Sequence, residues 1–330
     1  MMFDAIIGQE RPARFLAQML QKRSIPTALL FTGVDGIGRQ RTAIALGMAL
    51  NCSNPVGMSA CGKCDSCRKI ISGSHPDIIT VEPDGVFIKI NQVRDISKQL
   101  KFAPFEGGWR IVIINDAQSM NLEASNAILK ILEEPPKHTI FILTASQTTD
   151  LIPTIVSRCQ QIAFRPIPHE KVAQLLIEDR GLDRQTARTL AISTKGSLGK
   201  ALSMDAEKWK AWRSSIVEQI STLSGETIQP LFAFAETLSG DKNRLADALE
   251  MIMMWFRDVL ISKVTPDRII SEDFENEIRS ASQEESVDSL LEKLEAVHFA
   301  QKAIARNANA RLTIEVMLLR LCRGDGTAVQ

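Results

Sequence analysis

Four cysteines near the start of the chain have the spacing of metal ligands. Cys52, Cys61, Cys64 and Cys67 fall within sixteen positions and form two overlapping Cys-x-x-Cys steps. Four thiolates complete a tetrahedral structural zinc site and leave no open position for catalysis. Disulfides are disfavoured in a reducing compartment, and an iron–sulfur cluster is the remaining alternative, although no other redox feature accompanies it. We therefore expect structural Zn²⁺ in this segment.

A glycine-rich segment that follows an apolar run could bind phosphate. Gly33, Gly36 and Gly38 have the spacing of a Walker A loop, in which backbone N–H groups surround a phosphate at a helix N-terminus. The lysine position of that motif holds Arg39. The next position, which normally places a hydroxyl on Mg²⁺, holds Gln40. The glycines by themselves would also fit a simple tight turn between a strand and a helix.

A second apolar run ends where the Asp-Glu pair of a Walker B strand would stand. Its last two positions are Asn115, an amide that brings no charge to Mg²⁺, and Asp116, which is one methylene shorter than glutamate. The changes in both motifs weaken hydrolysis. We expect a degenerate nucleotide site that does not hydrolyse ATP with Mg²⁺, formed by Gly33, Gly36, Gly38, Arg39, Asn115 and Asp116. Nucleotide binding without turnover stays open.

The elements that would position these residues alternate between strands and helices. Short apolar runs predict strands over 28–32, 77–82, 110–115, 139–145 and 161–164. Helical patterns fall between them, over 12–21, 41–50, 90–101 and 122–132, and the last ends before Pro135-Pro136. This alternation indicates an α/β domain, a parallel sheet flanked by helices.

Beyond residue 166 the strand-like runs disappear and helical periodicity continues to residue 322. Helices are predicted over 169–179, 183–193 and 197–204, then over 243–262, 286–307 and 310–322. The segment 324–330 has the composition of a loose tail. The second half of the chain is therefore expected to be all-α.

The bulk properties are those of a globular protein without a strong field of either sign. The 330 residues carry 39 basic and 39 acidic side chains, so the chain lacks the positive excess with which many proteins hold DNA unaided. No basic segment leads into an apolar one at the start, and no apolar run reaches about 18 residues. We expect a cytoplasmic protein whose contacts with DNA are shared with partners.

Longer motifs carry a resemblance to a known family. The segment Asn126–Pro136, with its Leu-Glu-Glu-Pro-Pro ending, and the segment Pro153–Cys159, with its Ser-Arg-Cys ending, resemble the AAA+ clamp-loader family of bacterial DNA polymerase III. Ile7-Gly8-Gln9-Glu10 resembles the family's box beside the adenine pocket, and Gly196–Leu202 resembles part of its lid. The resemblance is clear over most of the first 205 residues, and Asn309–Leu312 is similar to a segment of the family's collar.

The resemblance implies a three-part fold. Residues 1–166 would form an AAA+ P-loop domain with an inserted zinc module over about 52–67. Residues 167–205 would form a small helical lid, and residues 206–330 an all-α collar that holds the subunits of a ring together.

The resemblance also implies a role for the Ser157-Arg158-Cys159 segment. In the family this arginine reaches into the ATP site of the neighbouring subunit, where a planar guanidinium can offset charge on the γ-phosphate. Arg158, with Ser157 beside it, is thus the expected arginine finger in trans. A solvated side chain or a local ion pair is the ordinary alternative for such an arginine.

The departures from the family pattern indicate which kind of member this is. The lid position that commonly carries a phosphate-sensing arginine holds Gly199. A gamma/tau motor subunit would keep the Walker residues and the lid arginine, so the chain resembles a stationary, non-hydrolysing member. Its implied partners are gamma/tau motor subunits and a delta subunit in a five-membered ring, with the sliding clamp and primer-template DNA. The alternatives are an active motor ATPase with Arg39 in place of lysine, and a zinc-containing DNA-binding scaffold.

Overall fold

The computed structural model describes residues 6–223, 228–306 and 308–322. The chain divides into two compact units. The first contains Met1–Val172 and Thr194–Ser203, and the second contains Ala173–Ser193 and Met204–Gln330. Each is described by itself.

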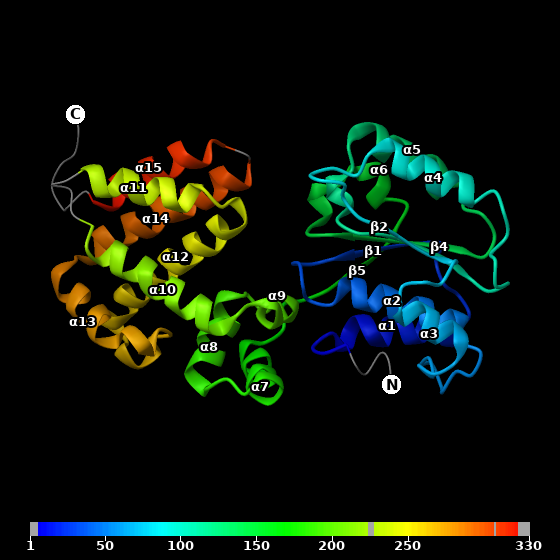
Figure 1. Cartoon of the computed structure of the whole chain (residues 1–330), viewed down its shortest axis with the longest axis horizontal. Coiled ribbons are helices and arrows are strands. Elements are labelled where there is room, and N and C mark those ends of the chain that lie inside the picture. The colour runs from blue at the N-terminus through cyan, green and yellow to red at the C-terminus, as the bar shows by residue number, and fades with distance from the viewer. Residues whose placement is uncertain (1–5, 224–227, 307, 323–330) are drawn as a thin grey trace. The chain divides into compact units, whose positions relative to one another are not determined.

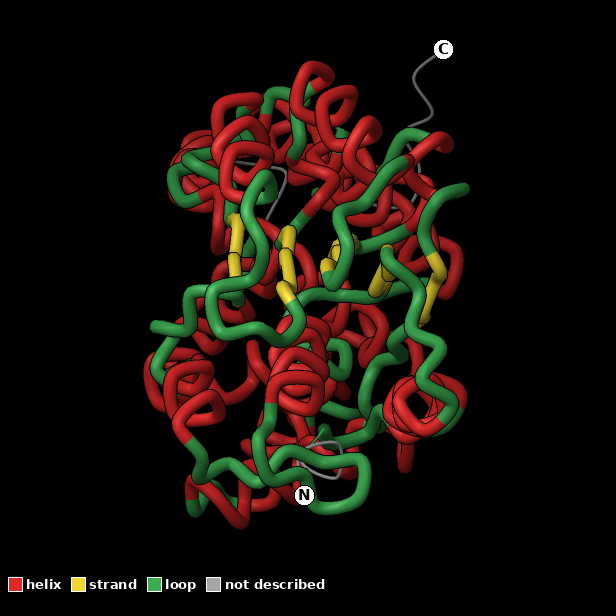
Figure 2. Tube along the Cα trace, turned by 90° about the vertical axis from the view of Figure 1, so that its right-hand side faces the viewer, coloured by secondary structure: helices red, strands yellow, loops and turns green. Residues whose placement is uncertain are grey.

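A five-stranded parallel sheet forms the centre of the first unit. Its strands are β1 (Ala28–Thr32), β2 (Ile78–Val81), β3 (Arg110–Ile114), β4 (Thr139–Ala145) and β5 (Gln160–Ala163). They pair in the order β2-β3-β4-β1-β5, and every pairing is parallel. Figure 2 shows the strands side by side. The predicted strands are found, most of them with ends shifted by one residue.

Helices cover both faces of this sheet. The helices α4 (Ile90–Gln99), α5 (Leu122–Glu133) and α6 (Pro153–Val156) lie on one face, and α1 (Glu10–Gln21), α2 (Arg39–Asn51) and α3 (Asp65–Ile71) lie on the other (Figure 1). Two short 3-10 turns, η1 (Ala117–Ser119) and η2 (Thr148–Asp150), follow β3 and β4. The helix α9 (Leu198–Ser203) also belongs to this unit.

The alternation of side chains along each strand supplies both cores. On β3, Val112 and Ile114 pack on one side of the sheet, and Ile111 and Ile113 pack on the other. All four are fully buried. A strand that is covered on both faces must be apolar throughout, which is why the strands read as continuous apolar runs.

The second unit contains no strand among its described residues. Its helices are α8 (Arg184–Ser193), α10 (Ala206–Ser221), α11 (Ile228–Ser239), α12 (Lys242–Val264), α13 (Glu275–Glu284), α14 (Val287–Ala305) and α15 (Ala310–Leu321), with the turns η3 (Pro266–Arg268) and η4 (Glu272–Phe274). Helix α7 (His169–Arg180) runs from the first unit into the second. In this unit α12 packs against α13 and α14, and α11 packs against α15.

These observations confirm the predicted fold class, an α/β domain with a parallel sheet flanked by helices, followed by a helical region. The division into domains over 1–166, 167–205 and 206–330 stays a prediction. The end of the predicted 286–307 helix and the predicted tail over 324–330 extend outside the described residues. Among the helices that the structure describes, none is long and apolar enough to cross a membrane.

Candidate functional site

A cavity of about 830 Å³ opens at the carboxyl ends of the strands in the first unit. This is the edge of a parallel sheet at which ligands commonly bind. Gly36, Gly38, Arg39, Gln40, Asn115 and Asp116 all line it. The structure thus brings the glycine-rich segment after β1 and the polar pair after β3 to one cavity, while Gly33 of the predicted site is not among its lining residues.

The glycine-rich segment makes a tight turn from β1 into α2. Gly36 and Gly38 have φ angles of +73° and +103°, a backbone region that residues with a Cβ atom rarely adopt. Gly38 immediately precedes the first residue of α2. The N-terminus of a thirteen-residue helix therefore faces the cavity and offers its partial positive charge there.

Gln9 ties this turn to the end of β5. Gln9 is 1% exposed. It belongs to the segment Ile7-Gly8-Gln9-Glu10, which resembles the family's box beside the adenine pocket. Its Nε2 donates to the carbonyl of Arg165 at 2.7 Å and to that of Ile37 at 3.4 Å. Its Oε1 accepts from the backbone N–H of Arg165 at 3.1 Å. The buried Gln9 amide therefore holds the cavity wall in place at Ile37, and its hydrogen bonds are all made to the protein backbone.

The residue at the lysine position is buried and lies between two carboxylates. The Arg39 side chain is 4% exposed, and its Nη2 lies 3.4 Å from Asp35 Oδ1 and 3.7 Å from Asp116 Oδ1. Its buried Nη1 has no hydrogen-bond partner among the described residues. The charge of the Arg39 guanidinium is thus partly neutralised by the protein's own carboxylates, Asp35 and Asp116.

The two amides that replace metal-binding groups converge on one carboxylate. Gln40 Nε2 and Asn115 Nδ2 each lie 3.3 Å from Oε1 of Glu82, the residue that follows β2. Both amides donate hydrogen to that oxygen. The side-chain oxygen of Asn115 is buried without a partner in the described structure. The Glu82 carboxylate is thus compensated by two neutral N–H donors.

Glu82 was not singled out in the sequence. The signal that could have found it is positional, because it follows the strand that neighbours β3 in a parallel sheet. Carboxyl ends of neighbouring parallel strands meet at one edge, so Glu82 and Asn115 must be close.

Asp116 and Thr42 are both held by local hydrogen bonds. Asp116 has a left-handed backbone with φ of 48°, and its N–H donates to Thr144 Oγ1 at 3.0 Å. Its carboxylate accepts from Gln118 Nε2 at 3.3 Å. The Thr42 hydroxyl donates to the Gly38 carbonyl at 2.8 Å and does not turn toward the cavity, so it does not replace the hydroxyl missing at position 40.

Gly199 in α9 touches the glycine-rich turn directly. Its N–H donates to the Gly36 carbonyl at 2.8 Å. A Cβ on Gly199 would lie 3.0 Å from both Cα and O of Gly36. The backbones are so close that a side chain at position 199 would collide with the turn, which gives a physical reason why no arginine stands there.

Arg158 lies at the surface, outside the cavity. It follows the short helix α6 and is 36% exposed, and it is not among the residues that line the cavity. The next residue, Cys159, is buried, and burial raises the pKa of its thiol to about 11. Ser157, before it, donates its hydroxyl to the Thr154 carbonyl at 3.1 Å.

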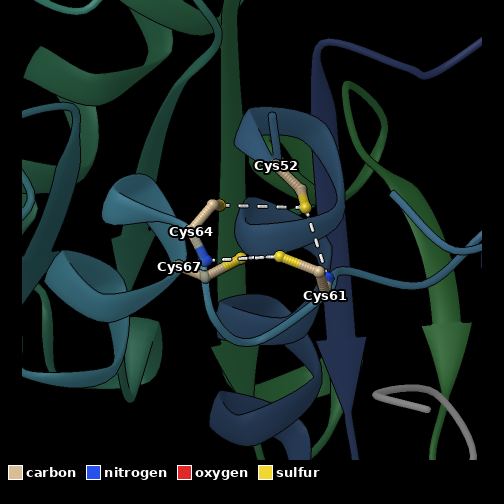
Figure 3. Close-up of side chains that lie close together, drawn as sticks. All are labelled: Cys52, Cys61, Cys64 and Cys67. Atoms are coloured by element: carbon tan, nitrogen blue, oxygen red, sulfur yellow. Dashed lines mark hydrogen bonds between the residues drawn. The ribbon is translucent and has the colours of Figure 1, made fainter. Parts of the chain in front are cut away.

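The four cysteines of the predicted metal site meet at the end of α2 and the start of α3 (Figure 3). Their sulfur atoms lie within 4.8 Å of one another, which is compact enough for one metal ion. Cys61 and Cys67 form one sulfur pair at 4.0 Å, and Cys52 and Cys64 form the other. The sequence prediction that they form one cluster is confirmed, and the donor set suits a soft or borderline cation.

Backbone N–H groups point at these sulfurs and favour the thiolate form. Lys63 and Cys64 donate to Cys61 Sγ at 3.4 and 3.3 Å, and these bonds lower the pKa of Cys61. The backbone N–H of Cys67 lowers the pKa of Cys64 to about 6. Burial raises the pKa of Cys67 to about 12, so burial opposes at Cys67 the thiolate form that the backbone N–H groups favour at Cys61 and Cys64.

Comparisons with known proteins identify the family to which this α/β protein with a helical second unit belongs. Residues 8–168 match the family model described as DNA polymerase III, delta subunit, and residues 207–322 match the model of its C-terminal part. The DNA polymerase III subunit delta' of Bacillus subtilis is 28% identical over 321 residues, which cover 96% of this chain and 97% of the relative. That of Pseudomonas aeruginosa is 32% identical over 236 residues, 70% of this chain and 69% of the relative.

The chain belongs to the family of DNA polymerase III delta' subunits. The tau subunit of Bacillus subtilis is also similar, at 26% identity over 97% of this chain and 61% of that protein. Among solved structures, a DNA polymerase III gamma subunit-related protein of Thermotoga maritima shares 19% identity, with a TM-score of 0.45 over 94% of this chain and 99% of that one.

Proposed function

We propose that this protein is a clamp-loader subunit that does not hydrolyse ATP itself and supplies Arg158 to the ATP site of an adjacent subunit. The observation that carries the proposal is a contrast within one unit. Arg158 stands at the surface outside the cavity, while the cavity holds the neutral amides Gln40 and Asn115 at the positions where a Walker site has a hydroxyl and a carboxylate for Mg²⁺.

The chemistry of Arg158 suits this task. A guanidinium can donate two parallel hydrogen bonds to phosphate oxygens, and its charge offsets the charge that develops on the γ-phosphate during cleavage. Fingers of this kind raise turnover by roughly 10³ to 10⁵. The buried neighbours Ile155 and Cys159 fix the backbone from which Arg158 projects.

The protein's own cavity is poorly suited to hydrolysis. Gln40 and Asn115 both donate to Glu82, so the carboxylate nearest to them is already occupied, and as neutral amides they bring no negative charge to a Mg²⁺ ion. Asp116 already contacts Arg39 and Gln118, which occupies the carboxylate that would activate water. These contacts support an inactive site rather than a motor ATPase with Arg39 in place of lysine.

The family supports a particular set of partners. We infer gamma/tau motor subunits and a delta subunit in a five-membered cytoplasmic ring that places the sliding clamp on primer-template DNA. The balance of 39 basic and 39 acidic residues supports shared rather than independent contact with DNA.

We also propose that Cys52, Cys61, Cys64 and Cys67 hold structural Zn²⁺. When bound, such an ion cross-links its protein ligands and adds its binding energy to folding. Here the ligands come from the end of α2 and from the segment that leads into α3, where Met48, Ala60, Cys67 and Ile70 form only a small core. A core of this size needs such a cross-link more than the sheet does.

The role of Arg158 is tested in the reconstituted complex with its loader subunits. Arg158→Ala should lower turnover at the neighbouring ATP site by roughly 10³ or more and reduce clamp loading on primed DNA, because the finger is lost. Arg158→Lys should also be impaired, since lysine keeps the charge but loses the bidentate fork. Arg14→Ala on the exposed face of α1 serves as the control.

Assembly is followed by size-exclusion chromatography of the same mixtures. A complex that assembles normally with Arg158→Ala and hydrolyses ATP at the wild-type rate would overturn the proposed function. Mg²⁺-dependent hydrolysis by the isolated chain would favour the motor ATPase.

The zinc assignment is tested by metal analysis of the purified chain. One equivalent of zinc is expected in the wild type and in Cys322→Ser, whose thiol lies outside the cluster. Cys64→Ser should lose the zinc and lower the thermal midpoint, because three ligands hold the ion much less tightly. Iron with visible absorbance in the wild type would instead identify an iron–sulfur cluster.

A further inference from the structure

The end of α5 and the segment after α6 lie next to each other because both are anchored in one core. Leu132 on α5 and Cys159 after α6 are buried in the same hydrophobic cluster, together with Ile128 and Ile155. Each anchor has a polar neighbour in the chain, Glu133 after Leu132 and Arg158 before Cys159. The shared core therefore brings these two polar residues together at the surface.

The side chains of Glu133 and Arg158 form a close ion pair. Arg158 Nη2 lies 2.6 Å from Glu133 Oε1, and Arg158 Nη1 donates to the Thr154 carbonyl at 3.1 Å. The two side chains are 36% and 51% exposed. One edge of the guanidinium is thus fixed by the protein, while the pair remains open to solvent.

These contacts leave hydrogen-bonding capacity on the guanidinium. An arginine side chain has five N–H donors in a planar fork, and the two contacts use two of them. Three donors remain for phosphate oxygens. Contact with Glu133 and contact with a neighbour's phosphate are therefore compatible.

We propose that Glu133 is a positioning residue for the Arg158 finger. It holds a long, otherwise mobile side chain in one orientation before the neighbouring ATP site approaches, which reduces the ordering that must occur there. Glu133 acts through Arg158 and does not itself touch the nucleotide. This inference rests on the proposed function of Arg158.

The adjacent residue Glu134 provides a matched control. It has the same charge and is also exposed, but the ion pair of Arg158 in the described structure is with Glu133. Glu133→Ala and Glu134→Ala therefore remove equal charge from neighbouring positions at the end of α5. Alanine suits a helix end and removes no core contact, so both variants should fold.

The experiment measures ATP turnover of the reconstituted loader complex. Glu133→Ala should lower kcat by roughly two- to fivefold, the factor that corresponds to an exposed ion pair. Glu134→Ala should leave kcat unchanged. Glu133→Gln, which keeps an acceptor oxygen but loses the charge, should fall between the wild type and Glu133→Ala.

A double-mutant cycle separates positioning from a structural role. If Glu133 acts through Arg158, the residual rate of Arg158→Ala should not change when Glu133→Ala is added. A wild-type rate for Glu133→Ala, or an equal loss in both backgrounds, would refute the positioning role while leaving the finger intact. A wild-type rate for Arg158→Ala would refute the proposed function instead.

Discussion

At the scale of single residues, the amide of Asn115 helps to compensate the charge of the Glu82 carboxylate in the cavity. It donates to Glu82 in concert with Gln40, so the carboxylate is satisfied without a cation. An aspartate at this position, as in a Walker B motif, would set a second carboxylate oxygen about where the amide nitrogen now lies, 3.3 Å from Glu82 Oε1. Two carboxylates at that distance repel each other unless a cation or proton intervenes.

Asn115→Asp should therefore make the stability of the protein depend on Mg²⁺. In EDTA we expect a loss of about 1–2 kcal/mol, because the repulsion between the two carboxylates would raise the pKa of the introduced carboxyl. The raised pKa means that this loss is present near neutral pH and disappears as the pH falls and the carboxyl takes up its proton. Mg²⁺ should recover part of the loss. Thermal unfolding with and without Mg²⁺ measures both effects.

Asn121→Asp is the control for added charge. Asn121 caps α5 by accepting from the Ala124 N–H at 2.9 Å, and aspartate caps helices equally well. It should have nearly wild-type stability and no response to Mg²⁺. A Mg²⁺-independent Asn115→Asp variant with wild-type stability would contradict the arrangement around Glu82.

At the scale of elements, α9 and the glycine-rich turn after β1 act as one packed piece. The Gly199 N–H bonds the Gly36 carbonyl, and a Cβ at Gly36 would lie 2.3 Å from Ser197 Oγ. Glycine at both positions allows the two backbones to touch. The same closeness leaves little room for any side chain at position 199.

The sign of the change in stability caused by Gly199→Ala shows whether close packing or helix propensity dominates at this position. Propensity alone favours alanine over glycine inside a helix by roughly 0.5–1 kcal/mol. The collision with the Gly36 backbone should instead cost about 1–3 kcal/mol, because backbone atoms cannot move aside easily. We expect net destabilisation in thermal unfolding, with faster hydrogen exchange over residues 194–203.

Gly240→Ala is the comparison, since a Cβ there would meet nothing closer than 3.4 Å. It should leave both the thermal midpoint and exchange over 194–203 close to wild type. A stabilised Gly199→Ala variant would show that the contact with Gly36 is absent in solution.

At the scale of the whole molecule, the features that suggest chemistry all belong to the first unit. The cavity, Arg158 and the four cysteines lie within Met1–Val172 and Thr194–Ser203. The described residues of the second unit form helices and turns, and neither the cavity lining nor the cysteine cluster includes any of them. The 39 basic and 39 acidic side chains of the whole chain cancel, so the molecule has no strong net positive field.

Elements with a strong local pattern were predictable, and those without one were not. The strands β1 and β4 begin and end where the apolar runs predict, because burial on both faces demands apolar residues throughout. Helix α3 was not predicted, since its seven residues overlap the cysteine cluster and are too few to show helical periodicity. Helix α6, with four residues, was missed for the same reason.

The sequence by itself determined the residue types in the two predicted nucleotide motifs, the cysteine cluster and the family, because each motif depends on residues close together in the chain. Only the tertiary structure decided the partners of those residues. Glu82 meets Asn115, Glu133 meets Arg158 and Gly199 meets Gly36 across separations of 33, 25 and 163 positions. Such meetings are set by the order of strands in the sheet and by shared buried neighbours, which no local pattern records.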